Sequence, residues 1–109
     1  MKKTLAFLMM IPSLANAEFF TGNQLLEKIQ DREVWGKMQA LGYIQGVADA
    51  YMNVSYCPPI GVTAGQINDM VKNHLESNPA TRNRTADLII RDVLKAAWPC
   101  QNRTPARAI

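Results

Sequence analysis

The chain has 109 residues, 48% of them hydrophobic, and twelve Lys and Arg against nine Asp and Glu give it a formal net charge of +3. Two of the lysines lie in the first three residues, so residues 18–109 carry ten basic and nine acidic side chains, a net charge of only +1. These scattered charges do not form the clustered basic face of a nucleic-acid-binding protein, and we expect no nucleic-acid partner.

The N-terminus has the three parts of a secretory signal peptide. Two lysines follow Met1, the apolar run from Leu5 to Leu14 comes next, and Ala15-Asn16-Ala17 has the A-x-A spacing of a cleavage site. The apolar run is too short to span a bilayer. We therefore expect a signal peptide over residues 1–17 that is cleaved after Ala17, and a periplasmic product with no stable membrane insertion.

The remaining residues, 18–109, predict one small helical domain with a flexible tail over residues 101–109. Export places the two cysteines, Cys57 and Cys100, in an oxidising compartment, where we expect them to form a disulfide. Closing that long loop would contribute about 4 kcal/mol to stability in the chain-entropy model. Two free, buried thiols are the alternative interpretation.

Hydrophobic periodicity and helix-start signals predict an all-α fold, a small bundle of approximately four helices closed by one disulfide. Thr21 and Thr63 are each followed three residues later by Gln, the spacing of a capping box. Thr85 is expected to cap the last helix, and Asp31-Arg32-Glu33 to be a turn or the first turn of a long second helix. The predicted helices cover residues 22–30, 34–53, 64–77 and 86–98.

The second helix is the most apolar segment, and we expect it to lie at the centre of the bundle. On a helical wheel its predicted core side chains share one broad arc, with Ala40 at the edge: Val34, Met38, Leu41, Ile44, Ala48, Tyr51 and Met52. Gly42, Gly46 and Ala50 form a second stripe at i, i+4 and i+8. This stripe predicts close helix packing, either within the chain or across a homodimer.

The third and fourth helices each have an apolar face. These faces comprise Ala64, Ile67, Met70, Val71 and Leu75, with His74 among them, and Ala86, Ile89, Ile90, Val93, Leu94 and Ala97. Leu88 falls on the opposite side of the last helix, where we expect an exposed apolar contact. Asp49 is the lone carboxylate of the apolar second helix, and it either accepts a hydrogen bond at an interface or lies on a solvated edge.

The sequence offers little catalytic machinery. Cys57 and His74 would make a thiol–imidazole pair, but a disulfide would consume the thiol and His74 falls in an apolar stripe. One histidine with scattered carboxylates does not supply the three or four ligands of a metal site. We expect no catalytic residue, no metal and no cofactor, so the function has to come from surface shape.

Five segments occur in a familiar order along the chain. They are Thr21-Gly-Asn-Gln-Leu-Leu-Glu27, Leu41-Gly-Tyr-Ile-Gln-Gly-Val-Ala-Asp-Ala50, Cys57-Pro-Pro-Ile-Gly-Val-Thr-Ala-Gly-Gln66, Val71-Lys-Asn-His-Leu-Glu76 and Ala96-Ala-Trp-Pro-Cys100. Together they resemble the Rap/Tai immunity-protein family over nearly the whole mature chain. The resemblance implies a small periplasmic helical protein, often dimeric, that binds a cysteine amidase injected through type VI secretion and obstructs its peptidoglycan-cutting active site.

The chain departs from the family pattern at three positions. Many relatives have cysteines where this chain has Ile29 and Ala40, and both replacements are apolar. We infer that packing replaces a whole disulfide there. An aromatic residue is usual where His74 stands, which favours a core role for that histidine.

Our first hypothesis is an immunity protein that inhibits an amidase by steric occlusion. The proposed contacts lie in the proline-stiffened segment 58–61 and the polar connector 78–85, and they are Pro58, Pro59, Arg82, Arg84 and Leu88. A non-catalytic envelope scaffold with a different partner is the alternative. An enzyme that uses Cys57 and His74 is a third hypothesis.

Overall fold

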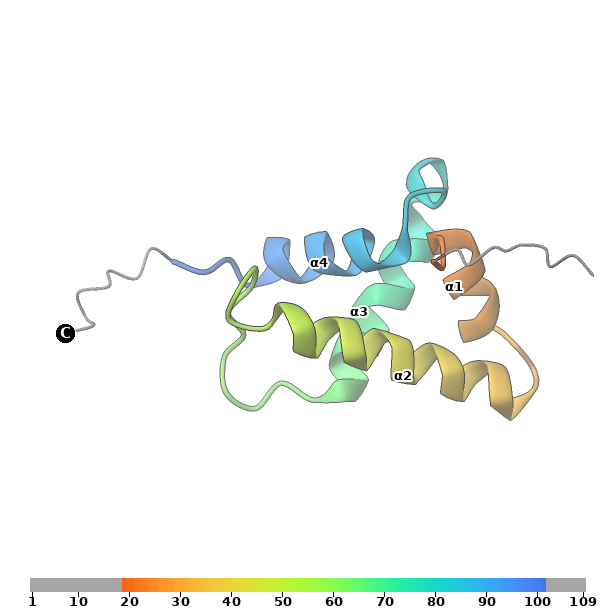
Figure 1. The fold of residues 1–109 in the computed structure, drawn as a ribbon, viewed down its shortest axis with the longest axis horizontal. Coiled ribbons are helices and arrows are strands. Elements are labelled where there is room, and N and C mark those ends of the chain that lie inside the picture. The colour runs from red at the N-terminus through yellow and green to blue at the C-terminus, as the bar shows by residue number, and fades with distance from the viewer. Residues whose placement is uncertain (1–18, 102–109) are drawn as a thin grey trace, which may run out of the picture.

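The structure is a computed structural model that describes residues 19–101, and these contain four α-helices and no strand (Figure 1). The helices are α1 (Gly22–Ile29), α2 (Val34–Tyr51), α3 (Ala64–Ser77) and α4 (Ala86–Ala97), with one 3-10 turn, η2 (Pro79–Thr81), before α4. In Figure 1, α3 crosses behind α2 and α4, and α1 lies beside the start of α2. Each helix packs against the other three. The predicted all-α bundle is confirmed, whereas the signal peptide lies outside the described residues.

Two helices begin with the capping boxes that the sequence predicts. At α1, the Gln24 N–H donates to Thr21 Oγ1 at 3.1 Å, and the Thr21 N–H donates to Gln24 Oε1 at 2.9 Å. At α3, Thr63 and Gln66 form the same pair of hydrogen bonds, at 3.1 and 2.9 Å. Each box satisfies backbone donors that a helix start leaves without intrahelical partners.

The fourth helix begins after Thr85, as predicted. Thr85 occupies the N-cap position, but its side chain accepts no capping hydrogen bond. The residue instead pairs with Thr21 in an isolated antiparallel bridge. This start therefore differs from those of α1 and α3, which have capping boxes.

The core uses only one side of the predicted arc of α2, because Ile44, Ala48 and the edge residue Ala40 are buried as predicted. The buried residues of α2 recur every four positions: Gly36, Ala40, Ile44 and Ala48. By contrast, four members of the predicted core arc are 40–62% exposed: Val34, Met38, Leu41 and Met52. Three helices approach α2 closely, and small side chains permit that approach, so the bundle buries the ridge with the smallest residues rather than the largest.

The rest of the core follows the predicted faces more closely. Ile67, Val71 and Leu75 are buried in α3. In α4 the buried set comprises Ala86, Ile89, Ile90 and Leu94. Ala64 and Ala97, which we expected to face inward, are exposed at the outer ends of their helices. Tyr56 is also completely buried although it belongs to no helix.

Ile29 and Ala40, where we inferred from the resemblance that packing replaces a disulfide, are close in this fold. Ile29 is partly buried against the core, Ala40 is 1% exposed, and both line the same small pocket of about 180 Å³. Their shared surroundings fit the inference that apolar packing between α1 and α2 replaces that disulfide.

Candidate functional site

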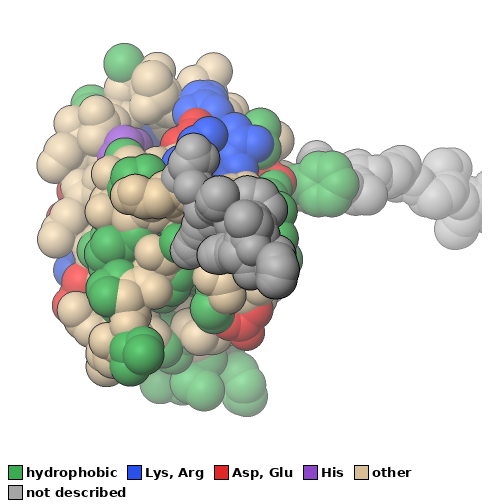
Figure 2. Space-filling view, turned by 90° about the vertical axis from the view of Figure 1, so that its left-hand side faces the viewer, with side chains coloured by type: hydrophobic (Ala, Val, Ile, Leu, Met, Phe, Trp, Pro, Cys, Tyr) green, Lys and Arg blue, Asp and Glu red, His purple; other side chains and the backbone are tan. Residues whose placement is uncertain are grey.

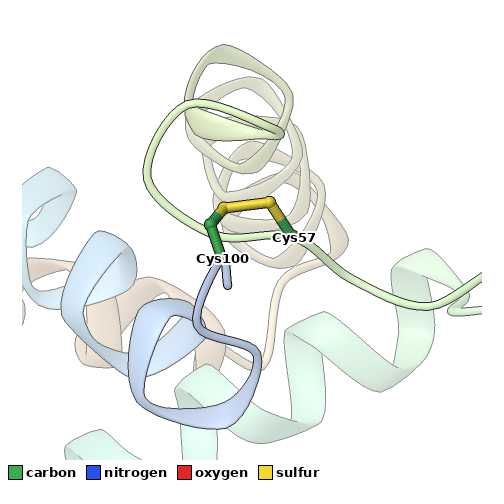
Figure 3. The surroundings of a disulfide bond; sticks show 2 residues. All are labelled: Cys57 and Cys100. Carbon is green, nitrogen blue, oxygen red and sulfur yellow. A yellow bond between two sulfur atoms is a disulfide. The ribbon is translucent and has the colours of Figure 1, made fainter. Parts of the chain in front are cut away.

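One end of the bundle is closed by a disulfide between Cys57 and Cys100, whose Cα atoms are 4.8 Å apart (Figure 3). The backbone reinforces this link, because the Cys57 N–H donates to the Trp98 carbonyl oxygen at 2.8 Å. The predicted pairing is confirmed, and the described residues contain no free cysteine. The thiol that a Cys57–His74 nucleophile would require is therefore absent.

The disulfide holds the connection between α2 and α3, residues 52–63, which we call the 52–63 loop. Its other anchor is Tyr56, whose ring is buried and lies 6.3 Å from that of Trp98. The Tyr56 hydroxyl donates to the Ala48 carbonyl oxygen at 2.8 Å. The backbone carbonyl oxygen of Tyr56 accepts a hydrogen bond from the Asn53 N–H at 2.7 Å. Asn53 has φ = 63°, a left-handed conformation that asparagine tolerates better than most residues and that turns the chain out of α2.

Burial and a neighbouring carboxylate both keep the Tyr56 hydroxyl protonated. Removal from water raises the pKa of Tyr56 above its usual value of 10.0, and the negative charge of Asp49 raises it further. The hydroxyl therefore remains a hydrogen-bond donor to Ala48 throughout the physiological range.

Beyond Tyr56 and Cys57, the loop arches outward before the capping box of α3. Pro58 and Pro59 restrict the backbone of the arch, and Gly61 has φ = 100°, a conformation that favours glycine. Ile60 is fully exposed between them, and Val54 is 75% exposed. Figure 2 faces this end of the molecule, where hydrophobic side chains gather over the left and lower part of the surface.

The second predicted contact region, residues 78–85, is called the 78–85 connector. It lies at the opposite end of α4 from the 52–63 loop, above α1 in Figure 1. Two of its carbonyl groups accept hydrogen bonds from the first turn of α1: Arg82 O from the Asn23 N–H at 2.8 Å, and Arg84 O from the Gly22 N–H at 2.9 Å. The connector is thus paired through its backbone with another part of the fold.

The connector's side chains are also engaged. Arg84 Nη2 lies 3.1 Å from Asp92 Oδ2, and Arg91 Nη2 lies 2.9 Å from Asp92 Oδ1. Burial alone would raise the pKa of Asp92, but the hydrogen bonds from Arg91 and Arg84 outweigh it and lower the pKa. The Nε atom of Arg82 is buried with no hydrogen-bond acceptor among the described residues. Leu88, which we expected to be exposed, is partly buried.

The five predicted contact residues therefore do not form one surface. Pro58 and Pro59 belong to the disulfide end, whereas Arg82 and Arg84 belong to the α1 end, where their carbonyl oxygens accept hydrogen bonds from α1. The 52–63 loop is the stronger candidate for a binding site, because it is tethered at its base and exposes apolar side chains at its tip.

Sequence reasoning missed a second exposed apolar surface, which we call the α2 outer face. It comprises Val34, Trp35, Met38 and Leu41, and Trp35 is 78% exposed. Gly42 and Gly46 adjoin it, and a Cβ built on either glycine would meet no atom within 4 Å. The Gly42/Gly46/Ala50 stripe thus has no close neighbour at its glycines within the described chain, and packing against a second copy stays a prediction. Trp35 lies outside the predicted core arc, and this position in the sequence could have indicated an exposed apolar surface.

The remaining candidates are modest. His74 is partly exposed at the edge of the α3 core face, and its Nδ1 lies 3.4 Å from Asn78 Nδ2. Among residues 19–101, no three His, Cys, Asp or Glu side chains converge as metal ligands. No helix in that range has the length and apolar character that crossing a bilayer requires.

These features define a class: a small, disulfide-bonded helical protein with exposed apolar surfaces suited to binding another protein. The family model of the Rap1a immunity proteins matches residues 21–100, from the first capping box to the second cysteine of the disulfide. The chain belongs to that family, as the resemblance of its motifs predicts. No curated protein matches the chain.

Proposed function

We propose that this protein is a periplasmic immunity protein that binds a peptidoglycan-cleaving cysteine amidase delivered by type VI secretion and blocks its active-site cleft without chemistry of its own. Membership of the Rap1a immunity family supports a toxin as the partner. The amidase is the target that the motif resemblance favours.

The geometry of the 52–63 loop carries this proposal. Cys57 ties the base of the arch to the end of α4, and the buried Tyr56 fixes its entry. The tip is then presented by two prolines and a fully exposed Ile60. A pre-ordered loop loses little conformational entropy when it enters a cleft, and an apolar tip supplies the area that is buried there.

The test is co-expression of the full chain with candidate amidases exported to the periplasm, with lysis and binding as readouts. The wild type is expected to prevent lysis, and Ile60→Asp to weaken both protection and binding. Phe19→Asp is the matched control, since Phe19 is 74% exposed and lies outside the loop. If no amidase is bound or neutralised, the proposed function is wrong. If Ile60→Asp and Phe19→Asp weaken protection equally, the 52–63 loop is not the binding surface.

The same capture experiment addresses the alternative of an envelope scaffold. Purification of the protein with its partners from periplasm should recover a cell-wall hydrolase if the protein is an immunity protein. Recovery of a different envelope protein, with no hydrolase, would favour the scaffold.

We also propose a homodimer through the α2 outer face. Its exposed aromatic and aliphatic side chains flank two glycines at which a second helix can approach closely. Sedimentation of the wild type should give twice the monomer mass, and Trp35→Glu should give a monomer that still folds. A monomeric wild type at high micromolar concentration would contradict this proposal.

The periplasmic location is supported by the disulfide, which persists in oxidising compartments, together with the signal-peptide pattern of residues 1–17. Mass spectrometry of the exported protein should find Glu18 at the N-terminus. An intact Met1 in that protein would contradict cleavage.

A further inference from the structure

A pocket of about 380 Å³ lies beneath the 52–63 loop, between the C-terminal half of α2 and the start of α3. Its apolar walls include Met52, Ile60 and Ile67, and the prolines of the arch form part of its rim. Gln45 and Asp49 of α2 supply polar groups to the lining. The pocket is thus continuous with the exposed tip of the loop.

Two polar groups of this pocket, on Gln45 and Asp49, are hydrogen-bond acceptors that have no donor among the described residues. Gln45 Oε1 is shielded from water and has no hydrogen-bond partner among the described residues. Asp49 is exposed to solvent, and its carboxylate forms neither a hydrogen bond nor an ion pair with any residue of that part of the chain. Because the two residues are four positions apart, they lie on the same side of α2.

Two neighbouring donors are already used. The Tyr56 hydroxyl donates to the Ala48 carbonyl, and the Thr63 N–H donates to Gln66 in the capping box. None of the side chains that line the pocket is basic. The pocket therefore combines apolar walls, an unneutralised carboxylate and an unpaired amide oxygen.

A long aliphatic side chain that ends in a cation matches this combination. Its stem would cover the apolar walls, and its head would donate to Asp49 and, after rotation of the soft terminal torsion of Gln45, to Oε1. An arginine fits best, since its planar fork carries several donors and can serve two acceptors at once. An apolar side chain would leave Gln45 Oε1 unpaired, and an acidic one would be repelled by Asp49.

We propose that this pocket receives an arginine side chain, or less tightly a lysine, from the protein that the 52–63 loop binds. The identity of that protein as an amidase rests on the proposed function. The chemistry of the pocket can be tested without the amidase.

The first experiment titrates ¹⁵N-labelled protein, residues 18–109 with the disulfide intact, with N-acetyl-arginine amide. The comparison ligand is N-acetyl-norleucine amide, which has an aliphatic stem but no cation. We expect saturable NMR shifts at the Gln45 side-chain amide, Asp49 and Ile60 with the arginine ligand only. Asp49→Asn should abolish them, and Asp69→Asn, at an exposed position of α3, should not. No shifts, or equal shifts with both ligands, would overturn the proposal.

A second form of the protein, ending at Gln101, distinguishes another occupant. Residues 102–109 contain Arg103 and Arg107, and they follow directly after the disulfide end. If the arginine ligand binds this shortened form but not the longer one, the chain's own tail occupies the pocket and the proposal of a partner's arginine is wrong. Equal binding to both forms supports it.

The last experiment uses the amidase. Where the wild type neutralises an amidase, Asp49→Asn and Gln45→Met should each weaken binding about tenfold or more, with Asp69→Asn as control. Unchanged binding would overturn the pocket proposal and leave the proposed function standing. If the wild type binds no amidase, the proposed function fails, and the arginine titration alone decides the pocket.

Discussion

The two loops on either side of α3 are held in opposite ways. The 78–85 connector is fixed by its backbone, with Arg82 and Arg84 carbonyls paired to the first turn of α1. The 52–63 loop is fixed at its base by side chains, the Cys57–Cys100 disulfide and the buried Tyr56. Backbone pairing fixes the connector against α1, whereas anchoring at the base holds the 52–63 loop and leaves its tip free for a partner.

The largest expected effect comes from breaking the tether of the 52–63 loop. Cys57→Ser with Cys100→Ser should lower the free energy of unfolding by about 4 kcal/mol, since the bond no longer restricts the unfolded chain. For a domain of this size the melting temperature should fall by on the order of 15 °C or more. Thermal unfolding of the double variant against the wild type measures this. A change below about 1 kcal/mol would contradict the assigned importance of the bond.

The connector should be most sensitive where α1 meets it. A Cβ at Gly22 would lie 2.7 Å from Ile89 Cδ1 and 2.8 Å from the Arg82 carbonyl oxygen. Gly22→Ala should therefore cost about 1–3 kcal/mol of stability through overpacking. Gly65→Ala is the matched control, because a Cβ there would meet only Thr63 Oγ1, at 3.8 Å, and the better helix propensity of alanine should stabilise α3 by up to about 1 kcal/mol. Equal denaturation midpoints for the two variants would contradict this packing.

A smaller effect is expected at the second anchor of the 52–63 loop. Tyr56→Phe removes the hydrogen bond to Ala48 and should cost about 1 kcal/mol at neutral pH. Because burial and Asp49 raise the pKa of Tyr56, its contribution is complete below pH 10 and is lost as the pH rises through the folded-state pKa. The cost of the substitution should therefore shrink in alkali. Tyr51→Phe, at a tyrosine whose hydroxyl makes no hydrogen bond among the described residues, should show neither effect.

The smallest effect is expected at the ion pairs beside the connector. The lowered pKa of Asp92 means that its contribution is present above the usual value of 3.8 and is lost as the pH falls through the folded-state pKa. Since the Asp92 side chain is 41% exposed, Asp92→Asn should cost only a few tenths of a kcal/mol at neutral pH. Chemical denaturation at pH 7 and at acidic pH tests this, and the difference between variant and wild type should shrink as the pH falls through the folded-state pKa.

The sequence was sufficient where local chemistry determines the structure. The Thr-x-x-Gln spacings at Thr21 and Thr63 predicted two capping boxes, because a capping box involves only neighbouring residues. The cysteine count and the expected export were enough for the disulfide, because two cysteines allow one intramolecular pairing.

The sequence was insufficient where packing between helices decides. Hydrophobicity alone placed Val34, Met38 and Leu41 in the core, but the bundle selected the ridge of small residues that includes Ala40 and Ala48. Tyr56 was missed because periodicity assigns a core role to residues in helices, and this tyrosine is buried from a loop.

The candidate site was predicted in part. The prolines of the 52–63 loop were identified from composition, and the structure places them on the rim of a pocket. The acceptors Gln45 and Asp49 could not be assigned to that pocket from sequence, since their surroundings depend on how the loop folds back over α2.

The disulfide has one further consequence. Cys57 and Cys100 enclose all of α3 and α4, so the bond closes both helices into one covalent ring. The unfolded oxidised chain is therefore more compact than the reduced one. On a non-reducing gel, the faster migration of the cross-linked form would separate oxidised molecules from reduced ones.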